Sequence, residues 1–176
     1  NFFVNMLKTE QDKKWIAIYT KPKHEFALKK NLEEKGFDVF LPVIREKKKW
    51  SDRNKWIESP LFKSYIFVRV NLKDTVLLFG HPGLVKIVRF GENFAIVNNA
   101  IMQGIKDMLD GGYQPVATDY FIKGSPVIVI EGPLKGMKGE VSRTGKNDKL
   151  IVRIDAIQHS ISINIKRNFL KHCKMQ

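Results

Sequence analysis

The stretch SPLFKSYIFVRV at residues 59–70 decides how the sequence is interpreted, because it has the composition of a strand with bulky side chains on both faces. Successive side chains of a strand point to opposite sides of its sheet. If Phe62, Ile66 and Val68 enter the core, the opposite face carries Leu61, Tyr65, Phe67 and Arg69. Exposed apolar patches usually mark binding sites. The stretch therefore predicts a sheet with one face for the core and one for a partner.

Length and composition are those of a globular protein with one large domain or two small ones. The chain has 176 residues, 43% of them hydrophobic, and a single cysteine, Cys173. One cysteine cannot staple a fold, so nothing indicates an oxidising compartment. No apolar run approaches the roughly 20 residues of a membrane span, and the first residues do not have the pattern of a signal peptide. We expect a cytoplasmic protein that makes no membrane contact.

The charge is strongly positive and unevenly distributed. The net charge is +13, with 16 Lys and Arg against 9 Asp and Glu in residues 1–70, four of each in residues 71–118, and 11 against 5 in residues 119–176. Such an excess favours a polyanionic partner, most often nucleic acid. Solubility alone is the alternative explanation.

The first part of the sequence predicts an α+β domain. Strands are expected at residues 15–20, 37–44, 56–70 and 84–91, and helices at 24–36, 74–79 and 98–112. In the first helix Glu25 is expected to pair with Lys29, and Gly36 to end it. The order predicts an antiparallel sheet flanked by helices over residues 15–110, after a tail at 1–14.

The last part predicts a small all-β barrel. Residues 111–119 are expected to be a linker, because Gly, Pro and polar residues gather there. Four or five short strands separated by turns then follow within residues 120–176. The stretch EGPLKGMKG is expected to be a tight turn between two of these strands, since it lacks the end of a phosphate-binding loop.

Catalytic, metal-binding and cofactor-binding sites are not predicted. The four histidines are scattered without ligand spacing, and no carboxylate pair stands out. We therefore expect a binding protein and not an enzyme.

Two basic stretches are candidates for nucleic-acid contact. One is a charged, hairpin-like connection at residues 45–55, in which Trp50 and Trp56 interleave with Arg45, Lys47, Lys48, Lys49 and Arg53. It either tracks a phosphate backbone and stacks on bases, or is a solvated loop whose tryptophans pack on the sheet. The other comprises Lys21, Lys23, His24, Lys29 and Lys30, for which a solvated helix face is the alternative.

Several motifs together resemble one family. WIAIYTKPKHEFALKKNLEEKGFDVFLPV from residue 15, PLFKSYIFV from residue 60 and GLVKIVRFGENFAIV from residue 83 resemble the N-terminal domain of the NusG family of transcription elongation factors. GSPVIVIEGPLKGMKGEV from residue 124 is similar to the KOW motif of the family's C-terminal barrel. KKWSDRNKWIESPLFKSYIFV from residue 48 resembles specialised antiterminators of the UpxY, RfaH and LoaP type, UpxY above all.

The resemblance implies that the first domain binds the clamp helices of the RNA polymerase β′ subunit through an aromatic patch and suppresses pausing or termination, on operons of the polysaccharide type. The matching patch residues are Tyr19, Tyr65 and Phe67, bordered by Phe40 and Leu61. Residues 75–82 correspond to the region that faces the β subunit. Lys21, Lys23 and His24 match the region that contacts non-template DNA, and nascent RNA is a second candidate nucleic acid.

For the barrel, the resemblance implies a KOW turn that contains Gly132, Pro133, Leu134, Gly136 and Gly139, with ribosomal protein S10 and the terminator Rho as candidate partners. We expect a stable barrel and a monomeric protein. A ribosome- or RNA-associated KOW protein remains the alternative, because KOW barrels also occur in ribosomal proteins.

Overall fold

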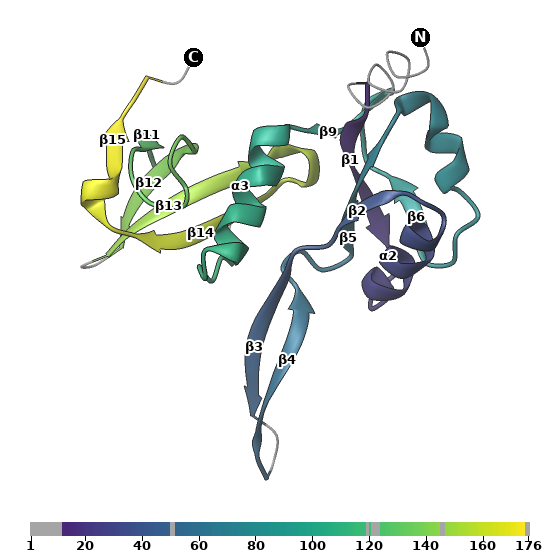
Figure 1. The fold of residues 1–176 in the computed structure, drawn as a ribbon, viewed down its shortest axis with the longest axis horizontal. Helices are drawn as coiled ribbons and strands as arrows, with labels where there is room; N and C mark the ends of the chain where they lie inside the picture. The colour runs from purple at the N-terminus through teal and green to yellow at the C-terminus, as the bar shows by residue number, and fades with distance from the viewer. Residues whose placement is uncertain (1–11, 50–51, 119, 121–123, 145–146, 175–176) are drawn as a thin grey trace. The chain divides into compact units, whose positions relative to one another are not determined.

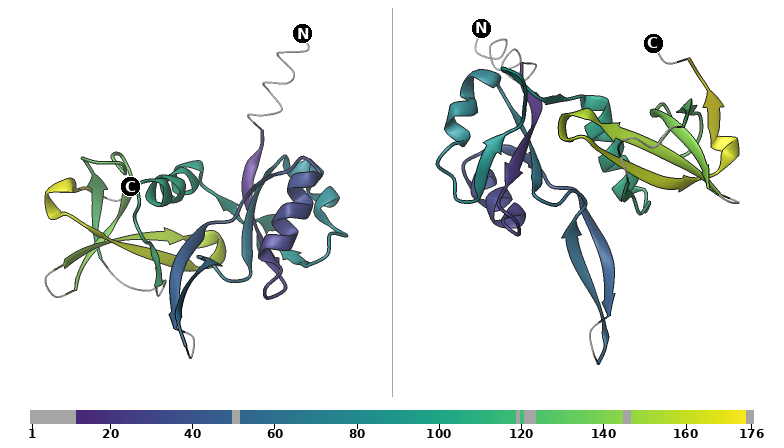
Figure 2. Two further views of the ribbon diagram at one scale, coloured as in Figure 1. Left: turned by 60° about the horizontal axis from the view of Figure 1, so that its bottom comes forward. Right: turned by 180° about the vertical axis from the view of Figure 1, so that it is seen from behind.

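The computed structural model describes residues 12–49, 52–118, 120, 124–144 and 147–174, and it divides into two compact units (Figures 1 and 2). The first unit comprises Asn1–Leu41 and Phe62–Asn99, and the second comprises Pro42–Leu61 and Ala100–Gln176. Of the expected tail at residues 1–14, residues 1–11 lie outside the described residues. No helix of the described residues is both long and apolar enough to cross a membrane.

The first unit is built on an antiparallel sheet. Its strands run in the order β2 (Asp38–Phe40), β5 (Tyr65–Val70), β1 (Lys14–Thr20) and β6 (Leu84–Ile87), and β9 (Ile96–Val97) also pairs with β1. The 3-10 helix η1 (Leu72–Leu78) follows β5, and the short strands β7 (Arg89–Phe90) and β8 (Asn93–Phe94) form a hairpin. The predicted antiparallel sheet is confirmed.

One face of this sheet forms the core of the unit with helix α2 (Glu25–Glu34). Ile18 lies opposite Ile66 and Ile16 opposite Val68, and all four side chains are fully buried. Leu28 and Leu32 of α2, one helical turn apart, are also fully buried. The helix ends at Glu34, and Gly36 follows its C-cap with a φ of 84°, in the left-handed region that glycine adopts without strain. Phe62, Ile66 and Val68 are therefore core residues, as the sequence predicts.

Two expected strands are each broken into two. Residues 37–44 form β2 and β3 (Val43–Lys49), because Pro42 lacks an N–H for a sheet. Residues 56–70 form β4 (Asn54–Pro60) and β5, separated by a turn that places Ser64 at a φ of 63°. Strands β3 and β4 pair only with each other among the described residues and form a two-stranded ribbon. The Leu61 amide closes its base by donating to the Pro42 carbonyl at 2.8 Å.

The second unit contains this ribbon, helix α3 (Asn99–Asp110) and a six-stranded antiparallel sheet in the order β10 (Val116–Thr118), β14 (His159–Ile165), β13 (Asn147–Ile154), β12 (Lys138–Thr144), β11 (Ser125–Val129) and β15 (Leu170–His172). The 3-10 turns η2 (Asp155–Ile157) and η3 (Arg167–Phe169) precede β14 and β15. Helix α3 buries Met102, Ile105 and Met108. Of the face expected from its spacing, Ile105 and Met108 are buried, whereas Ile101 and Leu109 are half-buried.

The expected linker at residues 111–119 is in part a strand. β10 pairs with the edge of β14, with Val116 opposite Ser162 and Thr118 opposite Ser160. Strand pairing satisfies backbone groups that an isolated edge leaves open. The described residues show no pairing between the end strands β10 and β15. The structure thus shows an antiparallel β domain, and barrel closure stays a prediction.

Candidate binding surfaces

The second face of the first sheet carries a pair of tyrosines. Tyr19 of β1 lies directly opposite Tyr65 of β5, with ring centroids 5.3 Å apart in an edge-to-face arrangement. Both side chains are half-buried. The Lys86 ammonium group of β6 lies 5.9 Å from the centre of the Tyr19 ring. Burial raises the pKa of Tyr65, and the neighbouring Tyr19 adds a smaller effect in the same direction.

Phe67 lies on the same face as Tyr65, but it is fully buried. It is opposite Ala17 and Phe40 in the sheet, and its ring centre is 6.0 Å from that of Phe62 in an edge-to-face contact. An aromatic ring with no exposed surface stabilises the fold and is not offered to a partner in this conformation. The expectation of an exposed Phe67 is therefore corrected.

The two predicted border residues differ from each other in exposure. Phe40 is half-buried, and its ring packs edge-on against Trp15 with centroids 6.4 Å apart. Leu61 is buried and falls in the second unit. The accessible part of the aromatic face is thus the pair Tyr19 and Tyr65 with Phe40.

A buried carboxylate holds the turn that precedes Tyr65. Glu25, in the first turn of α2, is only 4% exposed and accepts a hydrogen bond of 2.7 Å from the Ser64 amide. The Ser64 carbonyl accepts from the Thr20 amide at 2.9 Å. The expected Glu25–Lys29 pair is not the one formed, because Lys29 pairs with Glu33 at 3.1 Å. Sequence reasoning missed this role since the two partners are 39 residues apart.

The basic loop after Tyr19 is exposed and braced. Lys21, Lys23 and His24 all lie at the surface, as predicted for a binding loop and equally for a solvated one. The Lys21 amide donates to the Gly83 carbonyl at 2.8 Å. Gly83 has a φ of 94°, and a Cβ there would lie 2.9 Å from the Cβ of His24. Glycine at this position therefore permits the loop to pack closely against the turn before β6.

The β3–β4 ribbon presents its charges on both faces. Arg45 lies opposite Glu58 and pairs with it at 3.4 Å, Lys47 lies opposite Trp56, and Lys48 lies opposite Lys55. Trp56 is 62% exposed, so the alternative in which it packs on a sheet is wrong. Lys49 and Arg53 are also exposed. Trp50 lies outside the described residues.

An apolar surface lies on and after η1. Val76 is 67% exposed, Leu77 60% and Phe79 53%, whereas Thr75 and Leu78 are buried. The helix is fixed at its start, because the Asn71 side chain accepts from the Lys73 amide at 3.2 Å. These residues fall in the segment at 75–82 that the family resemblance singles out.

The predicted KOW turn closes the β11–β12 connection. Gly132 and Gly136 have φ values of 80° and 90°. The Gly136 amide donates to the Val129 carbonyl at 2.7 Å, which confirms a tight turn between strands. Pro133 is exposed and Leu134 is buried, so Leu134 belongs to the core. At Gly139 a Cβ would lie 2.6 Å from the Ile151 carbonyl oxygen.

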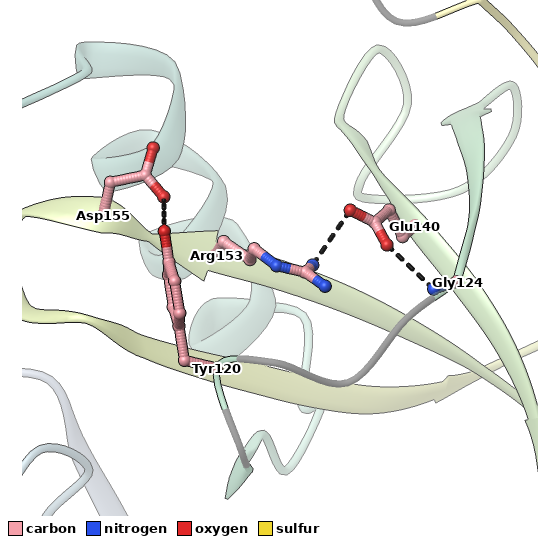
Figure 3. A network of polar contacts seen from close by, with 5 residues as sticks. All are labelled: Tyr120, Gly124, Glu140, Arg153 and Asp155. Carbon is pink, nitrogen blue, oxygen red and sulfur yellow. Dashed lines mark hydrogen bonds and ion pairs between the residues drawn. The ribbon is translucent and has the colours of Figure 1, made fainter.

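A polar network fixes two points of the chain between β10 and β11, one to η2 and one to the sheet of the second unit (Figure 3). The Tyr120 hydroxyl donates to Asp155 at 2.7 Å, and this hydrogen bond raises the pKa of Tyr120. Glu140 accepts from the Gly124 amide at 2.9 Å and pairs with Arg153 at 2.9 Å. Each carboxylate thus has a partner within the network, which indicates a structural role.

Among the described residues, no cluster of three or more His, Cys, Asp or Glu side chains could hold a metal ion.

Comparison with known proteins identifies the family. A family model described as "Transcription termination factor nusG" matches residues 13–106, more than half of the chain. No curated protein matches the sequence. A solved structure described as "Domain interaction in Thermotoga maritima NusG" aligns with 94% of this chain and 99% of that chain, at 20% identity and a TM-score of 0.53, which supports the fold.

A second aligned structure is described as an MjSpt4:Spt5 complex in conformation B. It aligns with 92% of this chain and 97% of that chain at 20% identity, but its TM-score of 0.29 is too low to support a structural argument. The sheet and helices of the first unit, the extent of the family match and the structural likeness agree, and the chain belongs to the NusG family.

Proposed function

We propose that this protein is a transcription elongation or antitermination factor that binds RNA polymerase through the Tyr19–Tyr65 face of its first unit. The observation that carries the proposal is the tyrosine pair, half-exposed on a sheet whose other face is fully committed to the core. A few large aromatic anchors usually supply most of the affinity of an interface. The family resemblance names the β′ clamp helices as the partner of this face.

The basic loop is the proposed nucleic-acid contact of the same unit. Lys21 and Lys23 follow Tyr19 directly in the chain and are held by the Gly83 turn. A positive loop beside an aromatic anchor adds association rate, orientation and salt dependence more than affinity. The nucleic acid expected there is exposed non-template DNA or nascent RNA.

The exposed apolar residues of η1 support a second polymerase contact. Val76, Leu77 and Phe79 lie where the resemblance expects a contact with the β subunit, and all three side chains are exposed. An exposed apolar cluster of this kind favours a protein partner. We propose that it contacts an apolar part of the β subunit.

The finer proposal concerns the role in the cell. The ribbon sequence resembles that of specialised antiterminators, so we propose action on particular long operons of the polysaccharide type. The buried Leu134 removes an apolar contact from the surface of the KOW turn. Any binding of ribosomal protein S10 or Rho would therefore have to use other residues.

The test is a pull-down on purified core RNA polymerase with Tyr19→Ala combined with Tyr65→Ala. We expect a loss of roughly 700-fold in affinity, because two interface anchors at about 2 kcal/mol each remove about 4 kcal/mol. The matched control is Phe90→Ala, which removes an exposed aromatic ring from the β7–β8 hairpin of the same unit. If the double variant binds core RNA polymerase as tightly as the parent, the proposal is wrong.

Affinity purification from cells tests the alternative of a ribosome- or RNA-associated protein. Polymerase subunits in the eluate support the proposal, and ribosomal proteins without polymerase favour the alternative.

A further inference from the structure

We propose that one face of the β3–β4 ribbon binds single-stranded nucleic acid, with an unpaired base stacked on the indole of Trp56 and with Lys47 and Lys49 on the adjacent phosphates. The inference goes beyond the proposed function, whose nucleic-acid contact is the basic loop of Lys21 and Lys23. It adds the type of strand, the face of the ribbon and the residue that recognises a base.

The strand register places these side chains on one face. Lys47 lies opposite Trp56, and Lys49 lies opposite Asn54, two residues further toward the tip. Side chains of directly opposed residues, and of residues two apart, share a face of an antiparallel pair. On the other side of Trp56, Arg45 is neutralised by Glu58 at 3.4 Å. No ion pair is found for Lys47 or Lys49 among the described residues.

Packing within the described residues does not account for Trp56. The indole is 62% exposed on a ribbon of only two strands, and a two-stranded hairpin gains little stability by itself. A cavity of about 560 Å³ lies beside the indole and gives room for a ligand; its lining is Arg45, Trp56, Ile57, Glu58 and Gln114.

The chemistry of the face favours a single strand over a duplex or a protein. Stacking requires the flat face of a base, which neighbouring base pairs cover in a duplex, where only base edges are open in the grooves. Indole stacks on any base, and its one N–H group is a poor reader of base edges. Protein interfaces are depleted in lysine at their centre, whereas here Lys47 lies directly opposite the aromatic ring.

Fluorescence of the full-length chain tests the proposal. Trp50→Phe leaves two tryptophans, of which Trp15 is buried and Trp56 is exposed. In this background we titrate oligo-dT, oligo-U and a base-paired DNA of equal length at fixed salt. We expect saturable quenching of Trp56 by the single strands and weaker binding without stacking quench by the duplex. Tighter binding of oligo-dT identifies a DNA strand as the source, and tighter binding of oligo-U identifies a transcript; either supports the proposal.

Variants separate stacking from charge. Trp56→Leu should weaken single-strand binding about 5- to 150-fold, the range measured for loss of one stacked base. Lys47→Gln with Lys49→Gln should reduce the slope of log K against log salt by about 1.4, since each phosphate contact on a single strand contributes about 0.7. The matched control, Lys29→Gln with Lys30→Gln, removes the same charge from α2, where both lysines already pair with glutamates.

Equal affinity of Trp56→Leu and the parent for single strands, or tighter binding of the duplex, would overturn the proposal. So would an equal slope change in the ribbon and α2 double variants. Polymerase pull-down of Trp56→Leu is measured in parallel. If Trp56→Leu binds polymerase and oligonucleotides as the parent does, only this inference is overturned. The proposed function is tested separately by the pull-down of the Tyr19 and Tyr65 double variant.

Discussion

Replacing Glu25 by alanine should destabilise the first unit and loosen the turn that presents Tyr65. The Glu25 carboxylate is 4% exposed and accepts a 2.7 Å hydrogen bond from the Ser64 amide. Hydrogen bonds to charged groups contribute about 1.5–3 kcal/mol, and an acidic group in the first turn of a helix adds about 0.3–1 kcal/mol. The Ser64 side of the contact is only part-buried, so water can replace some of the loss. We expect a loss of about 2 kcal/mol in the free energy of unfolding.

The assay is thermal unfolding followed by Trp15 fluorescence, in a background with Trp50→Phe and Trp56→Phe. Trp15 is buried in the first unit and reports on that unit. A domain of this size loses roughly 4–8 °C per kcal/mol, so Glu25→Ala should lower the midpoint by roughly 8–16 °C. Glu25→Gln keeps an acceptor oxygen but not the charge, and it should lose about half as much.

Ser64→Gly is the matched control. It keeps the amide donor and relieves a left-handed backbone at φ 63°, while glycine adds entropy to the unfolded chain. The two effects are similar in size, so its midpoint should stay near that of the parent. If Glu25→Ala lies within about 0.5 kcal/mol of the parent, the hydrogen bond does not hold the turn, and the reasoning fails.

Three further predictions concern Gly139 of the second unit, the tyrosine pair and the basic loop. Gly139→Ala should destabilise the second unit by about 1–3 kcal/mol, since the added Cβ would lie 2.6 Å from a carbonyl oxygen of β13; an unchanged thermal midpoint would contradict this close approach. The raised pKa of Tyr65 keeps its phenol protonated to higher pH in the folded than in the unfolded chain, so its stabilising effect is complete below the ordinary value of 10.0 and is lost as pH rises through the folded value. Tyr65→Phe should therefore flatten the fall of the melting temperature above pH 10, and a parallel fall in both proteins would refute the assignment. Lys21→Gln with Lys23→Gln should lower the salt slope of single-strand binding by about 1.4, measured by fluorescence anisotropy against the same α2 control; an equal slope would show that the loop is only solvated.

Sequence patterns predicted the elements of the first unit well where the signal is local. Leu28 and Leu32 lie one helical turn apart and Gly36 follows them, so the helix and its end could be placed from neighbouring residues alone. The alternation through Ile66 and Val68 likewise fixed which side of β5 enters the core.

Long-range geometry was not accessible to the same reasoning. Alternation places Phe67 on the face of Tyr65, but it says nothing of how closely Phe62 packs over that ring. Glu25 was assigned a helical ion pair, whereas its acceptor role depends on Ser64, 39 residues away. Short motifs report the periodicity of an element and do not report its tertiary neighbours.

The predicted boundaries of strands and of the linker were wrong where they depend on a single residue or on a neighbouring strand. Pro42 suggests an edge or a bend within the strand expected over residues 37–44, and in the structure it separates β2 of the sheet from β3 of the ribbon. Residues 116–118 were expected in a linker because the flanking glycines and proline dominate the composition. They form β10 because the edge of β14 supplies hydrogen-bond partners that the linker sequence does not reveal.

The burial of Phe67 changes how the proposed binding face should work. A patch of fully exposed phenylalanines would bind strongly, but it would also invite self-association in the free protein. Tyr19 and Tyr65 lie half-buried against each other, so each ring is already partly ordered before a partner arrives. Ordering side chains on binding costs free energy, and rings held by the sheet and by their mutual contact avoid part of that cost. Their hydroxyl groups tolerate water in the free state, which suits the proposed role of a surface that is open in the free protein and covered in a complex. The contact of Glu25 with the turn before Tyr65 then belongs to the binding face as much as to the core, because it fixes the backbone from which that ring projects.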